Sequence, residues 1–562
     1  MQQIIECVPN FSEGRDLNVI RQITGEIQAV EGVRLLNTDP GKATNRTVVT
    51  FVGHPAAVVE AAFRAIRKAG ELIDMSSHKG EHPRMGATDV CPLIPIAGVS
   101  MEETAAWAQK LARRVGEELQ IPVYLYEEAQ PNKQRSNLSV IRAGEYEGFF
   151  KKIALPEWAP DHGPAVHDIR RGATVIGARD FLVAYNVNLN TTSTRRANSV
   201  AFDVREAGRV LRQGDPINGK PVMGPDGIPV SIPGRLKAVK AIGWYIEEYG
   251  IAQISMNLTD IRVTPVHLAF DEVCRSAAER GLRVTGSELV GLIPLRAMLD
   301  AGKYFLQKQQ RSVGVSEKEL IRIAILSMGL DALAAFRPEE RIIEYLLDSP
   351  SDHALVNKNL IDFADETASE SPAPGGGSVS AYAGALGASL AAMVANLSSH
   401  KKGWDQRWAE FSAWAEKSQQ YKKELIDLVD ADTRAFNGIM AALSLPKATP
   451  EEKAARSKAI QEATKTAIEV PLRVMEVACA SLEPIQAMAS TGNPNSVSDA
   501  GVGALCARSA VLGAWLNVRI NVSGYDDKAW AEKVLARGKE LETRAIAAEA
   551  AILKIVDEKL SS

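Results

Sequence analysis

Residues 344–357 read EYLLDSPSDHALVN, and the character of the chain changes across this stretch. Before it, short β-branched runs alternate with segments in which apolar residues recur every three or four positions, which predicts sheets covered by helices. After it, β-branched runs almost vanish and long Ala-, Glu-, Lys- and Leu-rich segments follow, which predicts a helical bundle. We therefore expect an α+β N-terminal part followed by an all-α domain.

The α+β part is itself predicted to be divided. A segment rich in Pro, Gly and charge, 156–172, interrupts the alternation before a new strand begins at Thr174. Strands are predicted at 4–8, 47–52 and 181–187, and helices at 56–69 and 104–118. The predicted parts are two sheet-and-helix subdomains, 1–180 and 181–326, a linker over 327–354, and a helical domain over 355–562.

Composition narrows the function classes. The 562 residues exceed what a single core holds. With a net charge of −4, the chain lacks the basic excess typical of nucleic-acid binding, so we expect no nucleic-acid partner. Five scattered cysteines without a CxxC pair predict neither a disulfide framework nor a zinc ribbon. The first residues carry no signal-peptide pattern, so we expect a cytoplasmic protein.

One stretch has the length of a membrane span. Residues 379–397, VSAYAGALGASLAAMVANL, contain no charge, and about 20 apolar residues are enough to cross a bilayer. Ala, Gly and Ser dominate the stretch, however, and such small side chains contribute little transfer energy and allow close helix packing. We expect a buried helix of the bundle and no membrane partner.

The most suggestive local motif surrounds His82. Residues 78–95 read HKGEHPRMGATDVCPLIP, and their first five match the H-x-x-E-H zinc pattern. Gly80 and Pro83 oppose the helix that this pattern needs, so we expect no metal. An imidazole among charged neighbours suits proton transfer near neutral pH, although an ordinary surface histidine is also compatible with the pattern.

Several long motifs carry a resemblance to a known family. They are CVPNFSEGR (7–15), NTDPGKATNRT (37–47), the His82 motif, GATVIGAR (172–179), FLVAYNVNL (181–189) and SELVGLIP (287–294). Together they resemble the formiminotransferase domain of the formimidoyltransferase-cyclodeaminase family over roughly residues 1–325. The resemblance implies two subdomains whose sheets face one another, with folate between them. It also implies His82 as the base for moving a formimidoyl group from N-formimidoylglutamate to N5 of tetrahydrofolate.

Other candidates accompany His82 in this part. Asp39, predicted in a turn, could orient His82 or hold a cationic substrate group, or could simply form the turn. Arg84 or Arg46 could pair with a glutamate carboxylate, or with surface acids. Gly163, Pro164 and Gly172 match the family's folate-binding loop, whereas residues 167–171 depart from it.

The helical half shows a second resemblance. The motifs APGGGSVSAYAGALGASLAAMVANL (373–397), LVDADTRAFNGIMAALSLPKATPEEK (428–453), TGNPNSVSD (491–499) and GAWLNVRIN (513–521) resemble the cyclodeaminase domain over residues 355–562. This domain closes 5-formimidoyltetrahydrofolate to 5,10-methenyltetrahydrofolate with loss of ammonia. Asp432 matches the catalytic aspartate. Candidate binding residues are Gly375, Gly376, Gly377 and Ser378 at a helix start, with Asn493, Asp499 and Asn517.

Two neighbouring acids in this half raise a geometric question. Asp430 and Asp432 are separated by about 200° around a helix, so we expect at most one of them to face the bundle interior. The GGGS run at 375–378 could offer free N–H groups to a ligand or could simply link two segments.

Two other functions fit these patterns less well. The helical domain could be a methenyltetrahydrofolate cyclohydrolase, or the whole chain could be a non-catalytic folate-binding scaffold. The family resemblance further implies polyglutamylated tetrahydrofolate as co-substrate and a homo-oligomer, possibly an octamer.

Overall fold

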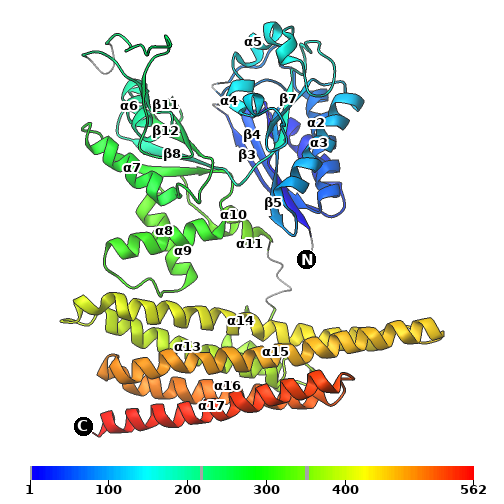
Figure 1. The fold of residues 1–562 in the computed structure, drawn as a ribbon, viewed down its shortest axis with the longest axis vertical. Helices are drawn as coiled ribbons and strands as arrows, with labels where there is room; N and C mark the ends of the chain where they lie inside the picture. The colour runs from blue at the N-terminus through cyan, green and yellow to red at the C-terminus, as the bar shows by residue number, and fades with distance from the viewer. Residues whose placement is uncertain (1–2, 43, 81, 215–218, 348–353, 562) are drawn as a thin grey trace. The chain divides into compact units, whose positions relative to one another are not determined.

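The first sheet of the protein brings together seven strands from its first 178 residues. In the computed structural model, which describes residues 3–42, 44–80, 82–214, 219–347 and 354–561, the strand order is β1-β4-β2-β5-β7-β6, with β3 paired to β4 (Figure 1). The strands are β1 (Ile4–Cys7), β2 (Asn10–Phe11), β3 (Val33–Gly41), β4 (Arg46–Gly53), β5 (Thr88–Ala97), β6 (Val123–Glu127) and β7 (Thr174–Ala178).

Alternate side chains of these strands have different surroundings: one set belongs to the hydrophobic core, and the other lines a cavity. Side chains of a strand point to opposite faces in turn, and Cys7, Phe51 and Leu93 belong to a hydrophobic core. This core also includes side chains of α1 (Leu17–Gln28), α2 (Pro55–Leu72) and α3 (Met101–Glu118). The intervening residues of β1, β4 and β5 line a cavity instead.

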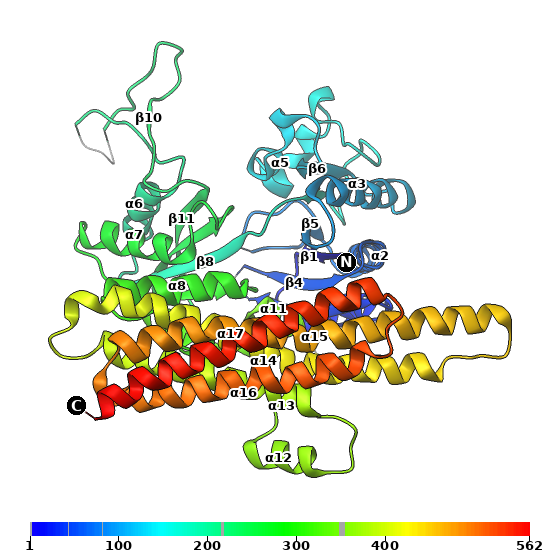
Figure 2. The ribbon, with the colours of Figure 1, turned by 60° about the horizontal axis from the view of Figure 1, so that its bottom comes forward.

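A second sheet of four strands follows, in the order β11-β12-β8-β13. All its pairings are antiparallel. Its strands are β8 (Val183–Leu189), β11 (Val239–Ile246), β12 (Ile251–Leu258) and β13 (Val284–Val290), with α6 (Thr194–Val204) and α7 (Val266–Ala278) packed against it. A short ribbon of β9 (Arg209–Val210) and β10 (Ser231–Ile232) extends away from α6 and α7 (Figure 2).

The rest of the chain is helical. Five long helices run side by side (Figure 2): α13 (Gly376–Ser399), α14 (Trp408–Ser444), α15 (Pro450–Thr491), α16 (Val497–Val522) and α17 (Lys528–Leu560). The shorter α12 (Leu360–Ala368) precedes them. The predicted fold class is therefore confirmed, because sheets with helices occur only before residue 300 among the described residues and helices alone follow residue 354.

Small residues allow α13 and α16 to pack very closely. A Cβ placed on Gly387 would lie 2.8 Å from the carbonyl oxygen of Gly503 and 3.1 Å from the amide nitrogen of Ala507. Two described segments, Gly376–Ser399 and Pro494–Val522, are long and apolar enough to cross a membrane, but 61% and 50% of their most apolar windows are buried inside the protein. Both helices contribute to the hydrophobic core of the bundle.

The chain forms two compact units, and each unit is made of two separate segments of the sequence. The first comprises residues 1–301 and 324–347, and the second comprises 302–323 and 348–562. Residues 302–323 belong to the helical unit because Val313 donates its N–H to Ser412 at 3.0 Å and the Asn396 side chain donates to the Gly314 carbonyl at 2.8 Å.

The segment predicted as a linker contains two short helices. It contains α10 (Pro338–Arg341) and α11 (Ile343–Leu347), and the Glu344 carboxylate of α11 accepts the N–H of Leu295 at 2.7 Å at the start of α8 (Leu295–Lys308). Its residues 348–353 lie outside the described part of the chain.

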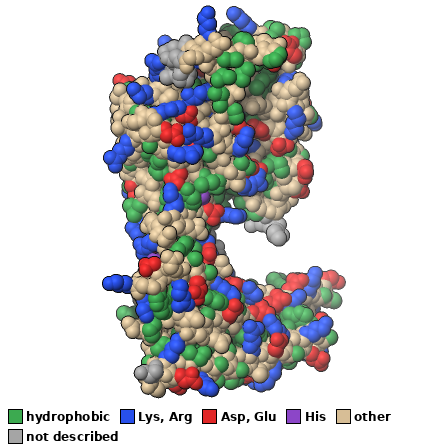
Figure 3. Space-filling view, turned by 60° about the vertical axis from the view of Figure 1, so that its left-hand side comes forward, with side chains coloured by type: hydrophobic (Ala, Val, Ile, Leu, Met, Phe, Trp, Pro, Cys, Tyr) green, Lys and Arg blue, Asp and Glu red, His purple; other side chains and the backbone are tan. Residues whose placement is uncertain are grey.

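On the face that Figure 3 shows, basic and acidic side chains are interspersed.

The close approach of α13 and α16 makes a testable prediction. Gly387→Val should lower the free energy of unfolding of the helical unit by about 1–3 kcal/mol, because the added atoms have no space. Gly438→Ala is the matched control, since nothing lies within 4 Å of its added methyl group, and it should not destabilise the unit. Urea unfolding followed by circular dichroism measures both, and equal stability of the two variants would contradict the packing argument.

Candidate active sites

The first unit contains a cavity of about 1240 Å³. One wall is formed by residues of β1, β4 and β5, and another by residues of β8, β11, β12 and β13. Of the residues predicted from the sequence, His82, Arg46 and Asp39 line this cavity. Arg84, Gly163, Pro164 and Gly172 are not among its lining residues.

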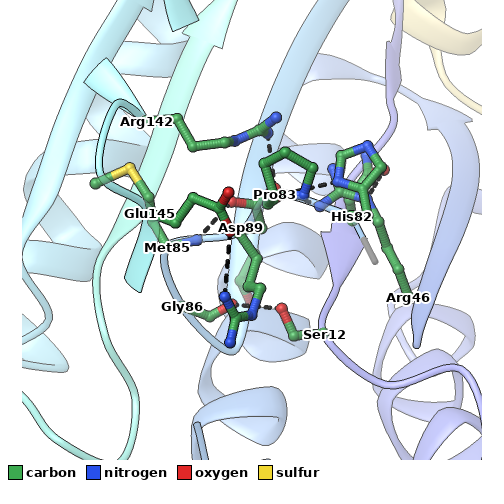
Figure 4. Close-up of polar contacts among 12 residues, drawn as sticks. Ser12, Arg46, His82, Pro83, Met85, Gly86, Asp89, Arg142 and Glu145 are labelled. Carbon is green, nitrogen blue, oxygen red and sulfur yellow. Dashed lines mark hydrogen bonds and ion pairs between the residues drawn. The ribbon is translucent and has the colours of Figure 1, made fainter. Parts of the chain in front are cut away.

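His82 presents one ring nitrogen for chemistry. Its Nδ1 lies 2.7 Å from the carbonyl oxygen of Pro83. Because a carbonyl only accepts, Nδ1 carries the proton and donates it, which leaves the lone pair of a neutral ring on Nε2. Figure 4 shows the ring beside the Arg46 side chain.

A buried carboxylate organises the surroundings of His82. Asp89 is fully buried and accepts hydrogen bonds from Arg46, from Arg142 at 2.7 Å and from the N–H of Met85 at 2.9 Å (Figure 4). Burial alone would raise the pKa of Asp89, but the two guanidinium groups outweigh burial and lower it. Burial, together with Arg46 and Arg142, lowers the pKa of His82 to about 3, so the ring is neutral at neutral pH.

Asp39 lies in a strand, and its predicted position in a turn is wrong. It pairs with Val48 within β3 and β4, because the chain reverses only after Gly41. Its carboxylate accepts the N–H of Gly291 at 3.0 Å and lies 3.6 Å from Arg341. Among the described contacts of Asp39 there is no hydrogen bond to His82.

The Arg84 side chain already has acidic partners. It forms a two-pronged pair with Glu147, at 2.9 and 2.7 Å, and a contact with Glu145 at 3.3 Å. Its Nε also donates to His78 Nδ1 at 3.2 Å. Arg84 therefore orients His78 and joins two segments of the first subdomain, and its role towards a ligand stays a prediction.

The predicted folate loop has a backbone role. Gly163 and Gly172 both have positive φ angles, 83° and 69°, and a Cβ on either would overlap a neighbouring carbonyl oxygen, that of Ile121 or Met85. Pro164 follows Gly163 and is half-buried. The sequence match at these glycines is explained by close backbone packing, and folate contact by the loop stays a prediction.

Several polar residues of the cavity escaped the sequence analysis. On the second sheet, the buried amides of Asn186 and Gln253 both donate to the Glu288 carboxylate, at 3.3 and 3.2 Å. On the first, burial raises the pKa of Glu6, whose side chain lines the cavity, to about 7. The available signal was the polar residues inside otherwise apolar strand motifs, such as the asparagines of FLVAYNVNL.

The second unit has its own acidic centre. The Asp432 carboxylate on α14 accepts the N–H of Ser378 at 2.9 Å and its hydroxyl at 3.3 Å, at the first turn of α13. Gly377 must lack a side chain, because a Cβ there would overlap this carboxylate. Burial raises the pKa of Asp432, while the bonds from Ser378 partly oppose the shift.

The expectation that at most one of the two aspartates faces the interior is wrong. Asp430 is 4% exposed and accepts the N–H groups of Leu355 and Val356 at 2.8 and 3.1 Å. Asp432 is half-buried against α13. Both aspartates have interior partners because the segment around Leu355 covers the second face of α14.

The predicted binding residues of this unit divide into two groups. Gly375, Gly376 and Asn517 lie near Asp432, and a Cβ on Gly376 would be 3.3 Å from the Asn517 amide nitrogen. Asn493 lies at the opposite end of α13, where its N–H is donated to Ser398 at 2.8 Å. Asp499 is about 27 Å along α16 from Asn517, at 1.5 Å per residue. Asn493 and Asp499 are therefore not in the Asp432 cluster of a single chain.

Within the described residues, no group of three or more His, Cys, Asp or Glu side chains is arranged to hold a metal ion. The five cysteines are unbridged.

The electrostatics of His82 can be measured directly. An NMR titration of the free protein should give a pKa of about 3 for His82. Arg142→Gln should raise this pKa, because it removes one cation that disfavours the imidazolium while Arg46 still pairs with Asp89. Arg64→Gln, which disrupts only a surface pair with Glu60 and leaves the site untouched, is the control. A wild-type value near 6.5, the usual pKa of histidine, would contradict this description.

Comparison with known proteins covers both units. Family models match in three segments: "Formiminotransferase domain, N-terminal subdomain" over residues 4–179, "Formiminotransferase domain" over 184–348, and "Formiminotransferase-cyclodeaminase" over 359–540. A methenyltetrahydrofolate cyclohydrolase of Methylorubrum extorquens is 43% identical over 33% of this chain and 88% of its own length. A crystal structure of formiminotetrahydrofolate cyclodeaminase from Thermotoga maritima is 28% identical, with a TM-score of 0.33, over 37% of this chain and 99% of that chain.

Full-length relatives settle the family. The formimidoyltransferase-cyclodeaminase of Mus musculus is 45% identical over 95% of both chains, and that of Dictyostelium discoideum is 40% identical over 100% of both. Both relatives therefore span the α+β unit and the helical unit together. The chain belongs to the formimidoyltransferase-cyclodeaminase family.

Proposed function

We propose that the first unit transfers the formimidoyl group of N-formimidoyl-L-glutamate to N5 of tetrahydrofolate. The second unit then closes 5-formimidoyltetrahydrofolate to 5,10-methenyltetrahydrofolate and releases ammonia. These are the two consecutive activities of a folate enzyme of histidine degradation. The observation that carries the proposal is that His82 and Asp432, two groups suited to proton transfer, lie in separate units of a chain that matches the bifunctional relatives over 95% of its length.

In the transferase reaction, His82 acts as the base. A bond forms between N5 and the formimidoyl carbon, and N5 loses its proton to the free Nε2 of His82. The bond from that carbon to the glutamate nitrogen then breaks, and the same proton passes to the leaving nitrogen. Burial, together with Arg46 and Arg142, keeps the ring neutral before binding, and substrate carboxylates that screen these cations would raise its pKa towards the working pH.

The arginines and Asp39 have roles in binding. Arg46 is suited to a carboxylate of either substrate, and Asp39 to a cationic nitrogen, because each charged group faces the cavity. The exposed Lys42 and Lys240 also line the cavity, and they suit the additional carboxylates of a polyglutamylated folate. The reaction requires no metal ion in this scheme.

In the cyclodeaminase reaction, Asp432 carries the proton. Starting from the protonated formimidoyl group, N10 attacks the formimidoyl carbon and loses its proton to the carboxylate. The bond from that carbon to the terminal NH₂ group then breaks as this nitrogen receives the proton and leaves as ammonia, and the positive charge remains on the methenyl product. The raised pKa of Asp432 suits such an exchange near neutral pH. The N–H of Ser378 holds the carboxylate in place.

We propose further that the protein is a cytoplasmic homo-oligomer, and the family resemblance favours an octamer. The neighbouring helices α13 and α16 carry a series of exposed apolar side chains: Val379, Leu386, Met393, Leu397, Val502, Leu505, Leu516 and Ile520. A second copy that packs on this face would remove them from water. A reducing compartment agrees with five unbridged cysteines.

Single substitutions should separate the two activities. His82→Ala should lower the transferase rate by about 10²–10⁴-fold, the usual contribution of a general base, and leave ammonia release from 5-formimidoyltetrahydrofolate unchanged. Asp432→Ala should do the reverse. Each variant is the control for the other, and both rates are measured on the full chain with the appropriate folate supplied.

The same assays test the alternative functions. Loss of both activities in one folded variant would contradict two separate sites. Hydrolysis of methenyltetrahydrofolate without ammonia release from the formimidoyl compound would assign the helical unit as a cyclohydrolase. Absence of both turnovers in the wild type, with folate still bound, would identify a scaffold.

The oligomer has its own test. Leu386→Lys combined with Leu516→Lys should reduce the number of copies per particle, because two charges would be buried in the proposed interface. Leu360→Lys, on the separate helix α12 and 74% exposed, is the control. Size-exclusion chromatography with light scattering measures the mass, and a monomeric wild type or an unchanged double variant would contradict the proposed interface.

A further inference from the structure

Glu288 on β13 is held in the cavity wall by three neutral donors. Asn186 on β8 and Gln253 on β12 donate side-chain N–H groups to Oε2 at 3.3 and 3.2 Å, and the Tyr249 hydroxyl donates to Oε1 at 3.1 Å. All three partners also line the cavity. A carboxylate offers about four lone-pair positions, so one position, on Oε1, remains for a ligand.

Further hydrogen bonds fix the amide groups that hold this carboxylate. Gln253 is fully buried, and its own oxygen accepts the Trp244 indole N–H at 3.1 Å. That bond orients the Gln253 amide so that its NH₂ group donates to Glu288 and, at 2.8 Å, to Asn188. The amide network thus holds an acceptor pointing into the cavity, at the cost of burying polar groups in a sheet.

No cation lies within ion-pair distance of Glu288 among the described residues. A partly buried carboxylate is normally compensated by a positive partner. Burial raises the pKa of Tyr249 to about 12, and the nearby carboxylates of Glu288, Glu248 and Asp39 add to this shift. Of these carboxylates, Asp39 has a cationic partner, Arg341 at 3.6 Å, which also lines the cavity. The side of the cavity around His82 differs, because Arg46 and Arg142 lie there.

The acidic side chains of Glu288, Glu248 and Asp39, here called the anionic wall, line the same cavity as His82. Asp39, which binds the N–H of Gly291 just after β13, pairs with Val48 on β4. Val48 is two residues, or roughly 7 Å, along β4 from Arg46. A small substrate can therefore contact the His82 side with one group and the anionic wall with another.

We propose that Glu288 binds the protonated formimidoyl nitrogen of N-formimidoylglutamate, and is thus a substrate-binding residue of the transferase. This inference rests on the proposed transferase function. A formimidoyl group on an amine is an amidine, which is cationic at neutral pH and presents N–H donors. The carboxylate stabilises this cation and so keeps the carbon electrophilic towards N5, while the proton released by N5 still moves through His82. Glu288 itself exchanges no proton.

The N–H edge of the folate ring is another possible partner for this acceptor, and kinetics can distinguish the two. Glu288→Gln removes the charge but preserves the shape. We expect kcat/KM for N-formimidoylglutamate to fall roughly 10- to 100-fold, the usual loss for a hydrogen bond to a charged group, with KM for tetrahydrofolate unchanged. Tyr249→Phe, which removes one supporting donor, should give a smaller change in the same direction.

Three controls make the result specific. Glu247→Gln, an exposed acid outside the cavity lining, should behave as the wild type. N-formylglutamate, an analogue whose formyl group is uncharged, should compete equally well in the wild type and in Glu288→Gln, because it has no cation for the carboxylate to bind. Ammonia release by the helical unit should be unchanged, which shows that the effect is confined to the transferase reaction.

Each other outcome overturns the inference in a distinct way. A rise in KM for tetrahydrofolate alone would assign Glu288 to the folate ring. Unchanged kinetics in Glu288→Gln with an active wild type would remove Glu288 from substrate binding and leave the proposed function intact. A wild type without transferase activity would instead contradict the proposed function itself.

Discussion

The buried Asp89 carboxylate is the interaction on which the first active site depends. It joins Arg46 of β4, Arg142 beyond α4 (Leu138–Ile141) and the N–H of Met85, so three segments distant in the sequence converge beside His82. A buried charge without these partners would be strongly unfavourable. Burial disfavours the imidazolium form of His82, and the same guanidinium groups that stabilise Asp89 add to this effect, so one cluster contributes both to the fold and to the protonation state of His82.

Both units contain carboxylates that accept hydrogen bonds from backbone N–H groups. Asp39 binds the N–H of Gly291, Asp432 that of Ser378, and Asp430 those of Leu355 and Val356. Each bond connects segments that are remote along the chain. Such bonds fix the position of a charged group without neutralising it, although Asp39 also lies within ion-pair distance of Arg341.

The fold class followed from the sequence because periodicity and composition report on local structure, and the change near residue 350 is abrupt. His82 and Asp432 were found through long motifs, since chemistry alone left His82 open to an ordinary surface role. Asp39 was misplaced because Pro40 and Gly41 resemble a turn although strand pairing continues through them. The Glu288 network was missed because Asn186 and Glu288, 102 residues apart, meet only when β8 pairs with β13.

The assignment of residues 302–323 to the helical unit means that the backbone passes between the two units three times, at 301–302, 323–324 and 347–348. Each unit is therefore built from two segments of the chain, and the segments of the two units alternate along the sequence. A single cleavage anywhere in the chain cannot release both units whole, since at least one unit would remain in two pieces or retain a segment of the other.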